Sequence, residues 1–136
     1  MARDAKPLPR IDEESRGWFE GLARHELWLQ RCGSCGTIRF YPRAVCTVCL
    51  SSEVVWERAS GHGTVYTFTV TYQNQAPAFR DELPYVFAIV ELAEGVRVVT
   101  NVVDCPPEAV RIGMPVEVVC DDVTPEVTLP KFRPVS

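Results

Sequence analysis

The sequence predicts a mainly β protein with an N-terminal helix, then a zinc ribbon, then a five-stranded OB-fold barrel. Two Cys-x2-Cys pairs stand ten residues apart within Arg31–Leu50, a pattern typical of a metal ribbon. After Glu53, short β-branched and aromatic runs alternate with turn signals, which indicates an all-β unit. Ahead of the cysteines, residues 12–25 have apolar side chains at helical spacing.

The composition limits the kinds of protein that the chain can be. Its 136 residues, 46% hydrophobic and 24% charged, suit one small soluble domain or two joined modules. A net charge of −4 disfavours a general nucleic-acid binder. No apolar run approaches the ~20 residues of a membrane helix, and no secretory signal is seen. Six cysteines in this setting favour metal binding over disulfides, so we expect a cytoplasmic protein.

The N-terminal helix is predicted to begin beside Asp12, whose carboxylate can cap the first turn. Gly17 and Gly21 weaken the helix but leave one side of it thin, so a neighbour can pack closely there. Two interpretations remain open. The helix either covers the ribbon or barrel, or it is a docking helix that offers Trp18 and Phe19 to another chain.

The cysteine pairs predict a zinc site. A Cys-x2-Cys turn points two thiolates at one spot, and two such turns supply four sulfurs in a tetrahedron. Such a site has no open position for water, so the expected Zn²⁺ is structural. A disulfide pair, a redox Cys-x-x-Cys motif and buried free thiols remain alternatives. The predicted metal ligands are Cys32, Cys35, Cys46 and Cys49.

The remaining chain is predicted to form short strands that close into a small barrel. The favoured barrel type is an OB fold, and an SH3-like barrel is the alternative. The proline-broken tail, residues 127–134, is predicted to be an edge strand or a docked peptide. The predicted division is an arm and helix (1–26), a zinc ribbon (27–52), and a barrel with its extended tail (53–136). The predicted barrel strands are 54–59, 64–72, 85–92, 96–103 and 114–121.

The order of the motifs resembles a known family, the zinc-ribbon plus OB-fold proteins called domain of unknown function 35, often labelled acyl-CoA-associated. The resemblance covers about residues 12–134. One departure is Leu50, which stands where a knuckle glycine is usual. The motifs are Trp18-Phe19-Glu20-Gly21, a Leu-x-Leu-Gln-Arg-Cys entry, the two knuckles, Gly-x-Gly-Thr-Val-Tyr-Thr-Phe-Thr, Leu-Pro-Tyr-Val, Ile-Gly-Met-Pro-Val and a closing Leu-Pro-x-Phe-Arg-Pro.

The resemblance implies a rubredoxin-like ribbon followed by an OB barrel. It also implies a role as a non-catalytic companion subunit of a thiolase-superfamily enzyme, such as a thiolase, an acyltransferase or a retro-aldolase of steroid side-chain breakdown. In a hetero-oligomer of this kind, the companion stabilises the enzyme and helps to form the acyl-CoA channel.

The residues themselves predict no catalytic group. The two histidines, His25 and His62, lie in no nucleophile motif. Cys105 has no evident base beside it to make it a nucleophile, and Cys120 is predicted to be a core residue. An enzyme acting on its own, or a redox protein, is therefore the least favoured of three hypotheses. The second is a single-stranded nucleic-acid-binding ribbon and OB module.

Contact with an acyl-CoA or a partner chain is a more plausible role than catalysis, although the arginines can equally form a solvated surface or an interface salt bridge. Arginines can bind the anionic phosphates of coenzyme A through paired hydrogen bonds. An apolar loop tip could line the acyl part. The candidate contact residues are Arg39, Arg43, Phe79, Lys131, Phe132 and Arg133.

Overall fold

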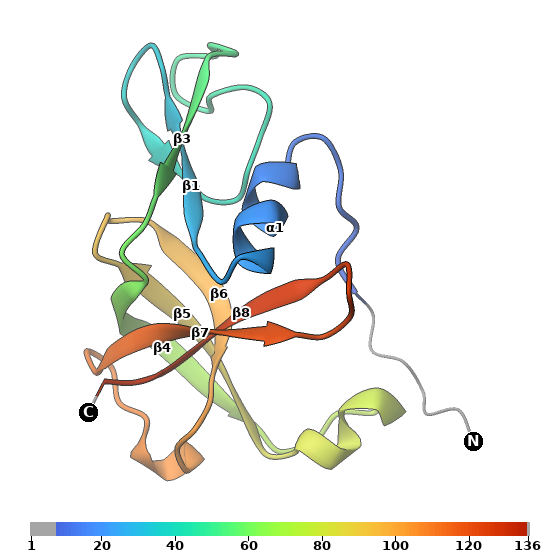
Figure 1. Ribbon diagram of the computed structural model, residues 1–136. Coiled ribbons are helices and arrows are strands. Elements are labelled where there is room, and N and C mark those ends of the chain that lie inside the picture. Colours follow the sequence, from blue (N-terminus) through green and yellow to red (C-terminus); the bar gives the residue numbers. More distant parts are fainter. Residues whose placement is uncertain (1–7, 136) are drawn as a thin grey trace.

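The computed structural model describes residues 8–135 (Figure 1). It has the predicted architecture: an N-terminal helix, a three-stranded ribbon sheet in the order β2-β1-β3, and a closed barrel in the order β4-β5-β6-β8-β7. The elements are α1 (Arg16–Ala23), β1 (Trp28–Cys32), β2 (Ile38–Arg39), β3 (Val54–Arg58), β4 (His62–Thr71), η1 (Pro77–Glu82), β5 (Tyr85–Leu92), β6 (Arg97–Val102), η2 (Pro107–Ala109), β7 (Pro115–Asp122) and β8 (Thr128–Pro134).

Helix α1 begins later than predicted, and the expected cap at Asp12 is wrong. The Asp12 carboxylate instead accepts hydrogen bonds from the backbone N–H of Ser15 at 2.9 Å and from its hydroxyl at 2.8 Å. This turn precedes the helix, which starts at Arg16. Trp18 and Phe19 are buried in the hydrophobic core, so the docking-helix interpretation is also wrong. The helix covers the fold.

The two helix glycines allow the close packing that was predicted. A Cβ atom placed on Gly17 would lie 2.6 Å from the ring of Trp56, and one on Gly21 would lie 2.4 Å from the ring of Trp28. The indole N–H of Trp28 donates to Glu26 at 2.9 Å, which holds that ring in place. Helix α1 is therefore fixed against strands β1 and β3 of the ribbon.

The barrel core comes from alternate residues of its strands. On β5, Val86, Ala88, Val90 and Leu92 are buried while Phe87 faces outward. Strands β5 and β6 form the predicted hairpin through Gly95, which has φ +94°. A bulge between Val65 and Thr67 bends β4 around the barrel. The five-stranded barrel is closed, as the OB interpretation requires.

The C-terminal tail is neither an edge nor a docked peptide, contrary to the prediction. Strand β8 lies between β7 and β6 and pairs with β7 along its whole length. Toward β6 the described residues make a single ladder pair, between Val102 of β6 and Phe132 of β8, and Val103 N–H donates to Phe132 O at 2.8 Å. Pro130 and Pro134 lie two residues before and after Phe132, so their backbones face the same neighbouring strand as that of Phe132. The N–H groups that the prolines lack would therefore point to this sparsely bonded side. The prolines are therefore compatible with a barrel strand.

The predicted barrel strand at 54–59 is wrong, because Val54–Arg58 is β3 of the ribbon sheet and β8 is the fifth strand of the barrel. The predicted division of the chain at residue 53 remains a prediction. We propose a boundary just after Arg58, because β3 pairs with β1 in the ribbon sheet from Val54 to Arg58. The ladder is extended by Ala59 N–H, which donates to Leu27 O at 2.7 Å.

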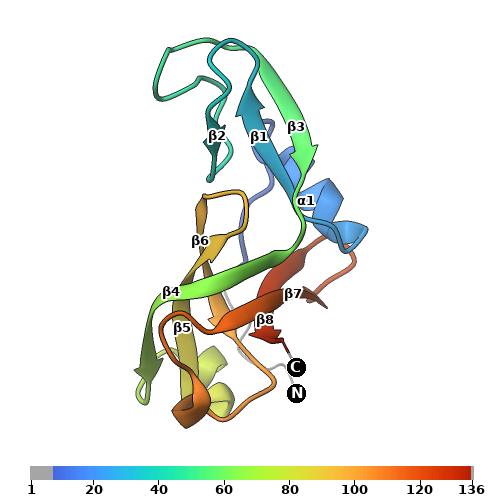
Figure 2. The same cartoon turned by 90° about the vertical axis from the view of Figure 1, so that its left-hand side faces the viewer.

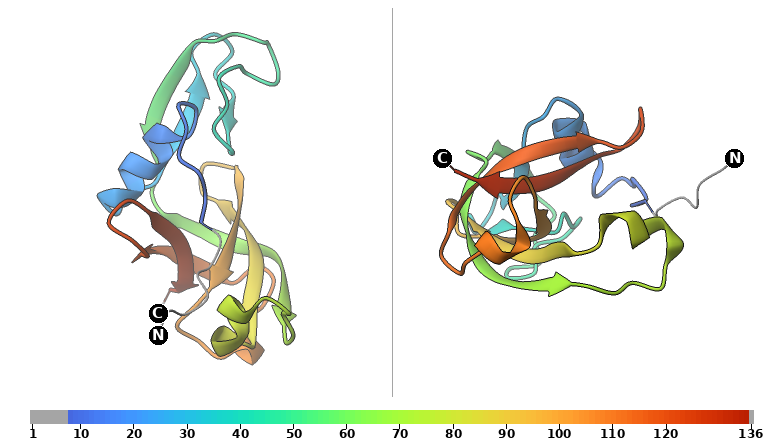
Figure 3. Two further views of the ribbon diagram at one scale, coloured as in Figure 1. Left: turned by 90° about the vertical axis from the view of Figure 1, so that its right-hand side faces the viewer. Right: turned by 90° about the horizontal axis from the view of Figure 1, so that it is seen from below.

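A hydrogen bond joins the end of helix α1 to the barrel. The chain leaves α1 through His25, which has φ +61°. The His25 ring nitrogen Nε2 lies 3.0 Å from the Asp122 carboxylate at the end of β7. The hydroxyl of Thr128 donates to the same carboxylate at 2.7 Å, and both contacts lower the pKa of Asp122, the Thr128 bond most. Figures 2 and 3 show α1 between the ribbon and the β7–β8 pair.

No helix within residues 8–135 is long and apolar enough to span a membrane.

We expect Gly21→Ala to destabilise the protein by about 1–3 kcal/mol, because the added methyl group collides with the held ring of Trp28. At a free helix position the same change would stabilise by about 1 kcal/mol. Thermal unfolding measures the difference, and Glu20→Ala on the exposed side of α1 is the control. An unchanged or raised melting temperature for Gly21→Ala would contradict the packing described here.

Candidate metal centre and barrel pocket

The four predicted ligand sulfurs converge at the end of the ribbon. All four Sγ atoms lie within 4.8 Å of one another. The Cys32 and Cys49 sulfurs are 3.5 Å apart, and those of Cys35 and Cys46 are 3.7 Å apart. A tetrahedral ZnS₄ centre with bonds of about 2.3 Å has sulfur–sulfur edges of about 3.8 Å, whereas a disulfide measures about 2.05 Å. The spacing therefore fits a metal ion and disfavours a disulfide.

The two knuckles share one backbone geometry although only one has a glycine. In the first, Gly36 N–H donates to Cys32 O at 3.0 Å; in the second, Leu50 N–H donates to Cys46 O at 3.0 Å. Both of the residues after the second cysteine have left-handed backbones, with φ +78° at Gly36 and +65° at Leu50. The departure at Leu50 therefore does not alter the knuckle, but it places a leucine where glycine is favoured.

Backbone N–H groups stabilise two of the sulfurs as thiolates. The N–H groups of Cys35 and Ser34 each lie 3.4 Å from Cys32 Sγ, and they lower the pKa of Cys32 to about 6. The equivalent N–H groups of the second knuckle, that of Cys49 first, lower the pKa of Cys46. These buried sulfurs are therefore prepared to bind a cation.

The pKa of Cys49 shows that bringing the four cysteine sulfurs together disfavours the thiolate form. A backbone hydrogen bond from Ser51 acts to lower the pKa of Cys49, yet its crowded sulfur neighbours, Cys32 first, and burial raise that pKa to about 12. Four thiolates this close repel one another unless a positive ion lies between them. The donor set thus fits a bound divalent metal ion.

Arg39 has a structural place between the knuckles. Its side chain is buried, with Nε donating to Gln30 Oε1 at 2.8 Å and Nη2 donating to Arg43 O at 2.9 Å. Gln30 Oε1 also accepts the N–H of Arg43 at 2.8 Å, so this network fixes the path from β2 toward the second knuckle. The buried Arg39 has little surface for a phosphate. Arg43 is exposed, with its guanidinium 5.1 Å from the centre of the Tyr41 ring.

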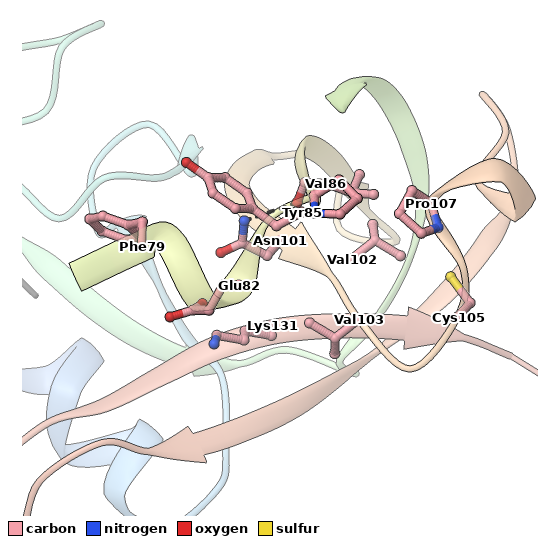
Figure 4. Close-up of a pocket in the computed structure, with 11 residues that line it drawn as sticks. Phe79, Glu82, Tyr85, Val86, Asn101, Val102, Val103, Cys105, Pro107 and Lys131 are labelled. Atoms are coloured by element: carbon pink, nitrogen blue, oxygen red, sulfur yellow. Dashed lines mark hydrogen bonds between the residues drawn. The ribbon is translucent and has the colours of Figure 1, made fainter. Parts of the chain in front are cut away.

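A pocket with a cavity volume of about 300 Å³ opens on the barrel. It brings together Phe79 and Lys131, two of the predicted contact residues (Figure 4). The Phe79 ring lies 6.2 Å from that of Tyr85, and Lys131 Nζ is paired with Asp121 at 2.9 Å. Burial raises the pKa of the Cys105 thiol at the other end of the pocket. Cys105 is therefore a neutral lining group rather than an activated nucleophile.

The other predicted contact residues lie elsewhere. Phe132 is fully buried in the barrel core, so its side chain has no accessible surface. Arg133 is exposed on β8, with its guanidinium 3.9 Å from Glu117. Sequence reasoning missed Tyr85, Asn101 and Cys105 as pocket residues. They come from separate segments that only the closed barrel brings together, so no local motif could have revealed them.

Comparison with known proteins matches both halves of this arrangement. Residues 19–55 match the family described as "ChsH2, rubredoxin-like zinc ribbon domain", and residues 56–121 match "ChsH2, C-terminal OB-fold domain". A "DUF35 domain-containing scaffold protein" of Methanocaldococcus jannaschii is 43% identical over 76% of this chain and 74% of its own length. The chain belongs to the DUF35 family. The resemblance seen in the motif order is thereby confirmed.

Two further similar proteins have descriptions that name an enzyme. A "Probable enoyl-CoA hydratase alpha subunit" of Thermomonospora curvata is 43% identical over 95% of this chain, which spans only 40% of that protein. A solved structure described as "Ltp2-ChsH2(DUF35) aldolase" has a chain 42% identical to this one, with a TM-score of 0.85. The match covers 93% of this chain and 98% of that one.

We expect Leu50→Gly to stabilise the protein by about 1 kcal/mol, because it relieves a left-handed leucine. Little packing is lost, since the Leu50 side chain is 76% exposed. Gly36→Leu is the reverse test at the equivalent position and should destabilise by a similar amount, because the backbone there is also left-handed. An added Cβ meets no neighbour within 4 Å, so no steric clash adds to that effect. Thermal unfolding of the metal-loaded protein measures both. Equal melting temperatures for all three chains would contradict the backbone argument.

Proposed function

We propose that the metal is Zn²⁺ and that it is structural. Support comes from the four sulfur donors and from sulfur spacings close to those of a tetrahedral zinc centre. Four protein ligands leave no open position for a water or substrate. The ion would link the two knuckles and so stabilise the ribbon. Thiolate ligands of this kind also suit a reducing compartment, in keeping with a cytoplasmic location.

The purified protein should carry about one zinc per chain by elemental analysis. Cys49→Ser removes one ligand, and we expect it to lose most of the metal and to lower the melting temperature. Cys120→Ser is the control, because that residue lies on β7 in the barrel and outside the cluster. A metal-free wild-type protein, or metal retained in full by Cys49→Ser, would contradict the zinc proposal.

We propose that the chain is a non-catalytic accessory subunit of a thiolase-superfamily enzyme, which it stabilises and whose acyl-CoA channel it helps to form. The observation that carries this proposal is the 42% identity over nearly the whole of a chain from an Ltp2-ChsH2(DUF35) aldolase. The chemistry of the described residues agrees with it. The Cys105 thiol is neutral, and the hydrogen bonds of the His25 ring go to Asp122 rather than to Cys105, so no histidine activates that thiol as a nucleophile.

The nucleic-acid alternative finds less support. A single-strand binder needs a groove of free positive charge beside stacking aromatic rings. On the barrel, Arg97, Lys131 and Arg133 each lie beside a carboxylate. The exposed aromatic Phe87 is accompanied on the outer face of the hairpin by Val99, which is apolar. This surface suits a protein partner better than a phosphate backbone.

The accessory role is tested by co-expression with a thiolase-superfamily subunit from the same organism. We expect a stable hetero-oligomer in size-exclusion chromatography, and carbon–carbon bond chemistry on an acyl-CoA by the complex. The isolated chain should turn over no thioester. Independent elution of the two chains, with full activity of the enzyme subunit alone, would contradict the proposal.

The barrel pocket is the proposed contact for the acyl part of the substrate, because Phe79 and Tyr85 give it an apolar wall. Phe79→Ala in the complex should raise KM for the acyl-CoA several-fold, since about 1–2 kcal/mol of apolar contact is removed. Ile112→Ala, at an exposed residue on the barrel side and outside this pocket, is the control. An equal effect of both variants, or none, would contradict contact at this pocket.

A further inference from the structure

The second knuckle exposes an unusual group of apolar side chains. Val45 is 44% exposed, Val48 68% and Leu50 76%, and we call these three residues the knuckle tip. They flank the metal ligands Cys46 and Cys49. Figures 1 and 2 place this part of the ribbon at the end of the molecule farthest from the barrel. Within residues 8–135, the rest of the fold therefore leaves the tip open to another molecule.

The stability of the free chain does not explain the leucine at the tip. Its backbone is left-handed, a conformation that residues other than glycine, asparagine and aspartate rarely adopt. The first knuckle solves the same geometric problem with Gly36. Because the Leu50 side chain is mostly exposed, burial within the chain does not compensate for the strained backbone. Strain of this kind, kept with no gain in folding, points to a role in recognition.

Charge around the tip defines what it can bind. Two of the ligand residues, Cys35 and Cys49, are exposed, and four thiolates around one divalent ion leave a net charge of about −2. The carboxylate of Glu53 adds to it, with Oε2 3.4 Å from the Ser34 hydroxyl. The nearby Arg31 is already paired with Glu57 at 2.9 Å. An apolar tip is thus bordered by negative charge.

We propose that the knuckle tip is the anchor by which this chain docks into its enzyme subunit, in an apolar pocket bordered by positive side chains or backbone N–H donors. This inference rests on the proposed accessory role and adds the surface that carries it. A second copy of the chain is not the occupant, because two negative metal centres would repel each other at close range. A nucleic acid is disfavoured for the same reason.

Apolar anchors that fill a partner's pocket account for much of the affinity of an interface. Two variants test the tip. Leu50→Asn keeps a residue that tolerates the left-handed backbone but removes the apolar branch. Val48→Thr replaces one methyl group by a hydroxyl at nearly constant shape. We expect Leu50→Asn to weaken binding to the thiolase-superfamily subunit roughly tenfold or more, and Val48→Thr severalfold. Isothermal titration calorimetry with the purified subunits gives the dissociation constants.

Ile112→Ala is the matched control, since Ile112 is 70% exposed on the barrel side of the molecule. It should bind as wild type does. Zinc content and melting temperature, measured for every variant, separate a lost contact from a lost fold. Unchanged affinity for both tip variants overturns the anchor and leaves the accessory role intact. Failure of the wild-type chain to bind contradicts the accessory role, and the anchor with it.

Hydrogen exchange supplies a second measurement that needs no substitution. On complex formation, amides of residues 45–50 should become protected more than those around Ile112. Protection that falls on the barrel alone, with the knuckle unchanged, would overturn the proposal.

Discussion

The convergence of four cysteine sulfurs is the constraint on which the rest of the ribbon depends. Each knuckle holds its sulfurs with its own backbone hydrogen bonds, but only a shared cation can neutralise both knuckles at once. The position of Cys32 at the end of β1 transmits this constraint to the sheet. At the other end of the same strand, Trp28 packs on Gly21 of helix α1. The ribbon therefore orients the helix although it has very little core of its own.

The helix in turn connects the ribbon with the barrel. It buries Trp18 and Phe19 in the common core, while His25 at its end meets Asp122 on β7. The barrel is closed by β8, whose prolines face the side on which few ladder bonds are made. A metal centre at one end and a closed sheet at the other thus make a rigid body from a short chain. Such a body suits a subunit that has to hold a surface in place, since neither end needs to open.

Most of the fold could be predicted, because its signals are local. The cysteine spacing, the strand periodicity and the turn at Gly95 each involve neighbouring residues. The errors arose where local signals compete or where contacts join distant segments. Asp12 looked like a helix cap, but its carboxylate closes a turn with Ser15. The sequence did not predict the barrel pocket, since Phe79 on η1 and Lys131 on β8 line it together only in the folded barrel, which no single motif encodes. The burial of Phe132 depends likewise on the place of β8 between two other strands.

Leu50 shows how the folding of this chain and its recognition of a partner place different demands on one position. The knuckle backbone requires a left-handed residue after the second cysteine, and Gly36 meets that requirement without strain. Leucine meets it only because the hydrogen bond to Cys46 and the neighbouring metal ligands over-determine the backbone. A strained position held by a metal centre is also a rigid one, so an apolar side chain there loses little conformational freedom when it enters a partner's pocket. In the proposed interface, the same four sulfurs that converge at the end of the ribbon would also hold its outer end ready for binding.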